Sequence, residues 1–160
     1  MTTDEGYQYF AEVGDDETVD RPGGLWRRAD GGMQYLSLID WAWHAAADEA
    51  DLPHPDLLVP VGLDQVRTLL GDRQRFAKYW VLRDTSGGEG PEIRVYRQLP
   101  SPENLVEEVF GRGNEWIPTN VIEDFLVGGP HDVADLEPID PATAERLIAQ
   151  TRGVSGATAL

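Results

Sequence analysis

Cysteine is absent from this sequence of 160 residues, and lysine is almost absent, since Lys78 is the only one. Without cysteine the chain can have no disulfide framework, no thiol nucleophile and no cysteine-ligated zinc or iron–sulfur site. No apolar run approaches the roughly 18 residues that a membrane-spanning helix needs. The first six residues are polar and acidic, unlike a signal peptide. We therefore expect a cytoplasmic protein that contacts no membrane.

Positive charge is also scarce, because 13 basic residues stand against 29 acidic ones, for a net charge of −16. Binding nucleic acid requires clustered lysine and arginine to neutralise phosphates, so this balance argues against a nucleic-acid partner. It permits a basic protein partner, although the charge could serve solubility alone. The bias towards arginine, beside abundant alanine, glycine, aspartate and valine, is typical of a GC-rich bacterial genome.

The two halves of the sequence can be aligned with each other. The matched segments, in chain order, are Tyr9–Val13 with Tyr79–Arg83, Leu25–Arg28 with Val95–Gln98, Trp43 with Trp116, Pro53–His54 with Pro130–His131, and Pro60–Val61 with Pro138–Ile139. The offset grows in one direction, as insertions in the second copy require. We therefore predict an α+β protein of two diverged β-β-β-α-loop-α modules, residues 7–72 and 76–151, packed as an internal pseudo-dimer between flexible tails at 1–6 and 153–160.

Local patterns predict the elements of each module. Short aromatic and β-branched runs predict strands at 9–13, 25–28 and 33–39, and 57–61 is extended. Residues 105–110 fit a helix or a strand, and the alignment favours the strand. The remaining patterns predict helices at 40–47, 63–70, 119–125 and 141–152, the last with Asp140 as its N-cap and Gly153 at its end. On these elements we expect Trp26, Tyr96, Leu69 and Leu147 to be buried.

The aromatic residues suggest where a partner could bind. On the predicted helix at 40–47, Trp41 and Trp43 would lie about 200° apart, so both could not face the core. An exposed tryptophan is a common anchor of protein interfaces. We therefore place a partner-binding face at these two tryptophans and the carboxylates beside them, which are Asp40, Asp48 and Glu49.

A second hypothesis places a small-molecule site between the modules. His54 and His131 are equivalent in the alignment, and Arg97 lies on a repeated strand, so the three could line a pocket there, in an enzyme or in a small-molecule binding protein. None of the histidines has a metal-binding spacing, and no glycine-rich or serine motif for catalysis is present. We therefore expect no metal, no cofactor and no catalytic residue. The first hypothesis is a non-enzymatic acidic protein that binds and masks a basic protein partner, as an immunity protein, antitoxin or adaptor would.

Overall fold

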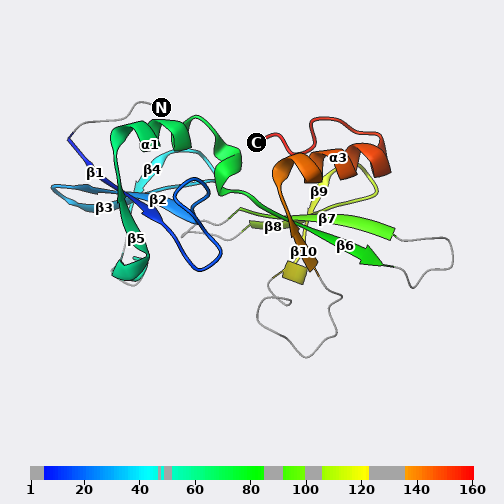
Figure 1. The fold of residues 1–160 in the computed structure, drawn as a ribbon, viewed down its shortest axis with the longest axis horizontal. Helices are drawn as coiled ribbons and strands as arrows, with labels where there is room; N and C mark the ends of the chain where they lie inside the picture. Colours follow the sequence, from blue (N-terminus) through cyan, green and yellow to red (C-terminus); the bar gives the residue numbers. More distant parts are fainter. Residues whose placement is uncertain (1–5, 47, 49–51, 85–91, 100–105, 123–135) are drawn as a thin grey trace. The chain divides into compact units, whose positions relative to one another are not determined.

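The computed structural model describes residues 6–46, 48, 52–84, 92–99, 106–122 and 136–160. They form two compact units, the first ending at Phe76 and the second beginning at Ala77. Each unit contains a five-stranded antiparallel sheet with one helix on it, so the α+β class is confirmed (Figure 1). Among the described residues no helix is both long enough and apolar enough to cross a membrane.

The first sheet is a four-stranded meander whose first strand also pairs with the fifth. Its strands are β1 (Gln8–Glu12), β2 (Gly24–Ala29), β3 (Gly32–Leu36), β4 (Trp43–Ala45) and β5 (Leu58–Val61). They lie in the order β4-β3-β2-β1-β5. Helix α1 (Leu63–Leu70) follows β5 directly, and two 3-10 turns, Pro55–Leu57 and Arg73–Phe76, flank this β5–α1 unit.

The second sheet has the same connectivity. Its strands are β6 (Lys78–Asp84), β7 (Glu92–Leu99), β8 (Val106–Phe110), β9 (Trp116–Pro118) and β10 (Leu136–Ile139), followed by helix α3 (Pro141–Arg152). Their order, β10-β6-β7-β8-β9, is that of the first sheet when it is read from the opposite edge. The strand expected at 105–110 is therefore confirmed as β8.

Residues that align in sequence hold corresponding places in the two ladders. In the first sheet Tyr9 lies opposite Arg27 on one side and opposite Val61 on the other. In the second sheet Tyr79 lies in the same way between Arg97 and Ile139. The two sheets therefore agree in pairing register as well as in strand order.

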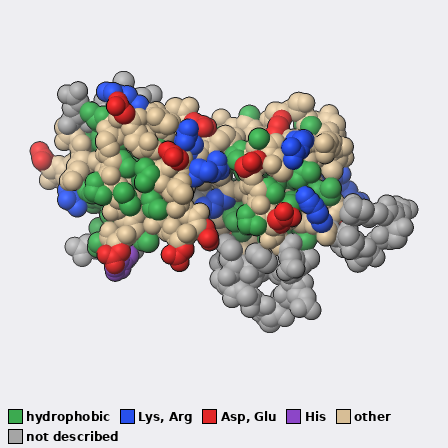
Figure 2. Space-filling view, viewed as in Figure 1, with side chains coloured by type: hydrophobic (Ala, Val, Ile, Leu, Met, Phe, Trp, Pro, Cys, Tyr) green, Lys and Arg blue, Asp and Glu red, His purple; other side chains and the backbone are tan. Residues whose placement is uncertain are grey.

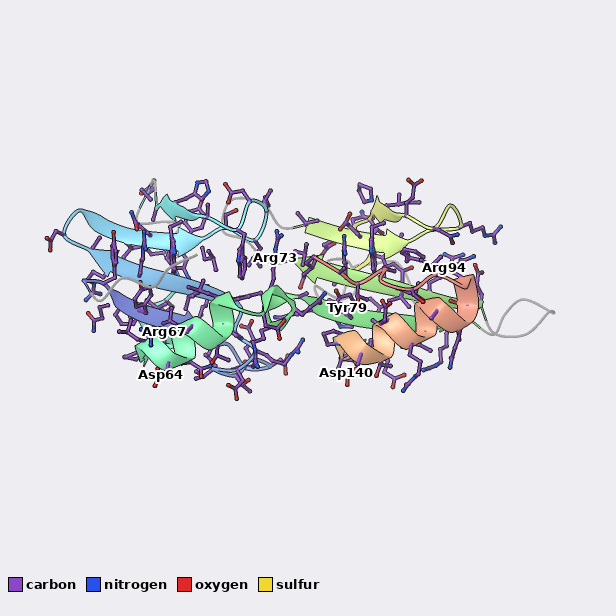
Figure 3. All side chains as sticks on the ribbon, turned by 90° about the horizontal axis from the view of Figure 1, so that it is seen from above. Asp64, Arg67, Arg73, Tyr79, Arg94 and Asp140 are labelled. Carbon is purple, nitrogen blue, oxygen red and sulfur yellow. The ribbon has the colours of Figure 1, made fainter. Side chains whose placement is uncertain are left out.

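One face of each sheet packs against its helix, and Figure 3 views both helices from above. Leu69 of α1 is fully buried in the first core, and Leu147 of α3 is 8% exposed in the second. Trp26 and Tyr96 are buried in separate clusters with other neighbours. The predicted burial of all four residues is confirmed.

The capping residues fix the ends of the helices where the sequence indicates. The Asp140 carboxylate accepts a hydrogen bond from the Thr143 N–H at 2.6 Å, and Pro141 occupies the first helical position. Gly153 ends α3 with a φ of 67°, a left-handed conformation that glycine adopts without a steric penalty. Gly71 follows the last residue of α1. Both predicted helices are confirmed.

The helix predicted at 40–47 is wrong, because this segment is a loop followed by β4. The Ser37 N–H donates to the Ala42 carbonyl at 2.8 Å, which closes a tight hairpin and returns the chain along β3. The alanine-rich composition favours a helix locally, but strand pairing within the unit overrides that weak preference. Within the helix expected at 119–125, residues 121–122 are helical, 119–120 are not, and 123–125 lie outside the described residues.

Candidate functional site

The hairpin loop between β3 and β4 carries the first of the predicted binding residues. Ile39, near its tip, is 51% exposed and is one of the few large apolar side chains that the described surface presents to solvent. The Asp40 carboxylate accepts a hydrogen bond from the Ala42 N–H at 3.0 Å, and its other oxygen lies 2.7 Å from His44 Nε2. The loop therefore presents an apolar side chain next to a carboxylate whose position is fixed.

The surroundings of Asp40 keep it ionised. Partial burial acts to raise its pKa, but the hydrogen bonds from His44 and from the Ala42 N–H, with the charge of His44, outweigh that effect. The pKa of Asp40 therefore lies below its ordinary value of 3.8. A carboxylate with this pKa carries a full negative charge at neutral pH.

Trp41 adopts a backbone conformation that is uncommon for a bulky residue. Its φ of 57° lies in the left-handed region, which costs L-residues other than glycine about 1–2 kcal/mol. Its indole packs edge-on against Phe76, with ring centroids 5.6 Å apart, and the Arg73 guanidinium lies 5.5 Å from the indole ring. Arg73, labelled in Figure 3, also donates to the Ile39 carbonyl at 3.1 Å. These contacts hold the loop in its strained shape.

Trp43 begins β4 and belongs to an aromatic cluster on the helix-covered face. Its ring lies 5.9 Å from that of Tyr9, and the Arg27 guanidinium lies 4.4 Å from its ring. Arg27 is also 3.9 Å from the Tyr7 ring, and its Nε donates to Gln34 at 2.6 Å. Arg27 is thus held between two aromatic rings and bonded to a neutral amide.

The second unit repeats this arrangement with one change of charge. Tyr79 and Trp116 lie 6.3 Å apart, and the Arg97 guanidinium lies 4.1 Å from the Trp116 ring. Here Arg97 is paired with a carboxylate, because Glu108 lies 2.8 Å from it and both side chains are less than a fifth exposed. The guanidinium of Arg97 is thus neutralised within its own sheet, in contrast to the amide partner of Arg27.

The predicted partner-binding residues are only partly brought together. Trp41 and Trp43 are both partly buried and pack into the first core cluster, so neither indole projects freely as an anchor. Asp40 lies in the same hairpin, and Asp48 is exposed after β4. Glu49 lies outside the described residues.

The residues of the predicted pocket are placed individually. His54 accepts a hydrogen bond from the Asp56 N–H at 3.2 Å, and its side chain is 69% exposed. Arg97 is bound to Glu108 as described. His131 lies outside the described residues. Sequence reasoning missed Ile39 as a surface residue. The pattern predicts a strand at 33–39, whereas β3 ends at Leu36 and Ile39 lies in the hairpin loop.

No model of a known protein family, no curated protein and no solved structure matches this chain.

Proposed function

We propose that the protein acts by binding a basic protein partner, and that the binding face is the β3–β4 hairpin of the first unit. The observation that carries the proposal is the pairing of exposed Ile39 with ionised Asp40 on a loop whose strain is concentrated at Trp41. Strained backbone persists only where the surrounding structure compensates for it, and it is often found at functional sites.

The net charge of −16 supports a basic partner. The sequence from residue 29 to residue 66, which contains the hairpin, has seven acidic residues and no lysine or arginine, and Arg73 from a later segment contacts the hairpin at the Ile39 carbonyl and the Trp41 ring. On the face that Figure 2 shows, acidic side chains are scattered over both units rather than gathered in one patch. A diffuse negative field attracts a basic partner and speeds encounter, whereas affinity comes from a few desolvated contacts. Ile39 is such a contact.

We further propose that the two units are diverged copies of one module. The identical strand order, the shared register and the repeated cluster of tyrosine, arginine and tryptophan support this origin. Divergence after duplication would explain why the equivalent hairpin of the second unit, Gly111–Glu115, has Asn114 in the left-handed conformation instead of Trp41. In this view the first unit acquired the binding face.

Two matched pairs of variants test the binding face. The protein is used to capture a partner from a lysate of its own cells, and the affinity of the purified partner is then measured at about 0.15 M salt. We expect Ile39→Lys and Asp40→Lys to weaken binding about tenfold or more, because each places a positive charge on the hairpin. Ile117→Lys, at a 41% exposed position of the second unit, and Asp30→Lys, on the β2–β3 turn, should have little effect.

The control variants make the same change of charge at exposed positions elsewhere. Equal losses in the test and control variants would show that only total charge matters, which would contradict a localised face. Retention of no partner at this salt concentration would contradict the proposed function itself.

A further inference from the structure

Three of the four edge strands in the two sheets contain a proline, and β4 does not. Pro60 lies in β5, Pro118 in β9 and Pro138 in β10. Proline lacks an N–H, so in an edge strand it removes a hydrogen bond that a further strand would need. Among the strands that the structure describes, β4 is therefore the edge that lacks this protection.

The pairing pattern shows which backbone groups of β4 face away from the sheet. The Ser37 N–H donates to the Ala42 carbonyl, and the Ala46 N–H donates to the Met33 carbonyl at 3.0 Å. Because hydrogen-bonded positions alternate along an antiparallel strand, His44 also faces β3. The N–H and C=O groups of Trp43 and Ala45 therefore point outwards. Within the described chain no hydrogen bond engages these outward groups.

The second unit shows how the same edge is closed. There the Thr119 N–H donates to the Glu107 carbonyl at 3.0 Å, which by the same alternation leaves Trp116 and Pro118 facing outwards. Pro118 therefore occupies in β9 the position that Ala45 occupies in β4. The corresponding edge carries a proline in the second unit, whereas in the first unit neither a proline nor a hydrogen bond from the described residues occupies it.

We propose that a basic partner of this protein adds an extended segment to the β4 edge as a sixth strand of the first sheet. The inference rests on the proposed function and names the mode of binding. Backbone hydrogen bonds to Trp43 and Ala45 would supply part of the affinity, as in other cases of strand addition. Ile39 and Asp40, in the hairpin that leads into β4, would contact side chains of the added strand.

Charge decides between a basic partner and a second copy of this chain. Two copies paired through β4 would bring together two chains of net charge −16, which repel each other. A strand with alternating arginines would instead place its positive side chains near Asp40. Because β4 has only three residues, the segment gains few backbone bonds and depends on these side-chain contacts as well.

Peptides of defined sequence test the proposal with the full-length protein. The probe is an eight-residue peptide of alternating arginine and valine, and its affinity is measured by titration. One control peptide carries an N-methyl group on every residue, which removes the backbone donors on both of its edges and keeps its charge. The other replaces arginine with glutamate. We expect only the first peptide to bind, and we expect protection of the Trp43 and Ala45 amides from hydrogen exchange in its presence.

Two reciprocal variants place the site. Ala45→Pro copies the protection of the second unit and should weaken binding about tenfold, the value of one lost hydrogen bond of roughly 1.4 kcal/mol. Pro118→Ala opens the second edge and should add a second, weaker site. If Ala45→Pro does not fold, the amide protection measured in the unmodified protein decides the question alone.

The remaining outcomes distinguish a failure of strand addition from a failure of the proposed function. Equal binding of the N-methylated peptide, or no protection at Trp43 and Ala45, would overturn strand addition. Preferential binding of the glutamate peptide would overturn a basic occupant, and concentration-dependent dimers that Ala45→Pro abolishes would identify a second copy as the occupant. Loss of partner capture in Ile39→Lys but not in Ala45→Pro would overturn strand addition and leave the proposed function standing.

Discussion

Glu145 and Thr158 are joined by two hydrogen bonds, because the backbone N–H and the hydroxyl of Thr158 both donate to one carboxylate oxygen, at 3.1 and 3.0 Å. The Gly156 N–H donates to the other oxygen. The indole of Trp116 donates to the Ala157 carbonyl at 2.8 Å, and Tyr79 donates to Thr158. Residues 153–160, for which the sequence predicts a flexible tail, therefore pack against α3 and the second sheet.

Neutralising Glu145 should weaken the packing of residues 153–160 against α3 and lower the stability of the protein. Partial burial acts to raise its pKa, but the hydrogen bonds from Gly156 and Thr158 outweigh that effect and lower the pKa below 4.5. A lowered pKa in the folded state gives stability that is present above the unfolded pKa and is lost as the pH falls through the folded value. Glu145→Gln should therefore lower the free energy of unfolding by about 1 kcal/mol at pH 7.

Urea unfolding at pH 7 and pH 3 measures this effect. The difference between Glu145→Gln and the unmodified protein should shrink at the lower pH, because protonation also neutralises the native carboxylate. Glu137→Gln serves as the matched control, since Glu137 has only a 3.8 Å ion pair with Arg83 and is largely exposed. A loss of the same size at both pH values would contradict the role of the carboxylate charge.

The arginines of the two aromatic clusters have different partners, a carboxylate for Arg97 and an amide for Arg27. Removing these partners should therefore lower the stability of the two units by different amounts. Glu108→Ala removes the partner of a largely buried guanidinium and should destabilise the second unit by about 2–3 kcal/mol. Gln34→Ala removes a neutral hydrogen bond to Arg27 and should cost the first unit about 1 kcal/mol. Thermal unfolding monitored by tryptophan fluorescence measures both losses, and equal values would show that the charge of Glu108 is irrelevant.

Because Trp41 has a left-handed backbone conformation, replacing it with glycine should destabilise the protein less than replacing it with alanine. Trp41→Ala and Trp41→Gly both remove the packing on Phe76, but only glycine adopts the φ of 57° without strain. We expect the glycine variant to be the more stable by about 1 kcal/mol in urea unfolding. Asn114→Gly and Asn114→Ala, at a φ of 58°, should show the same order. An alanine variant as stable as the glycine variant would contradict strain at this loop.

Shortening the core leucines of the two helices should be costly. Leu69→Ala and Leu147→Ala should each lower the free energy of unfolding by about 2–5 kcal/mol, because both side chains pack between helix and sheet. Gln150→Ala, at an exposed position of α3, should change it by less than about 0.5 kcal/mol. A loss below 0.5 kcal/mol at both leucines would show that the packing of the helices is misplaced.

The sequence predicted most elements because their signals are local. Asp140, Pro141 and Gly153 mark the ends of α3 by capping chemistry, and the apolar spacing of α1 identifies its buried side. The alignment of the two halves was needed to assign 106–110 to a strand. The segment at 40–47 was misassigned because its alanines favour a helix and the hairpin that forms β4 depends on pairing with β3.

The candidate site could be located only in part. The sequence indicated Asp40, Trp41 and Trp43, but it did not show that both indoles turn into the core or that Ile39 is exposed. Those features depend on the left-handed conformation of Trp41. Tryptophan rarely adopts this conformation, so the sequence does not predict it. Ala45 and Pro118 each lie two residues after the aligned Trp43 and Trp116, so the sequence alone shows that they differ. Only the structure shows that both residues lie in edge strands, where a proline affects further pairing.

The prolines on the other edges limit the valency of the protein. A molecule with two open edges could bind one strand on each side and so propagate into a fibre, as edge-to-edge aggregates do. With Pro60, Pro118 and Pro138 closing the other described edges, strand addition at β4 has no second site from which to continue. If strand addition occurs at β4, we therefore expect each chain to bind one segment directly.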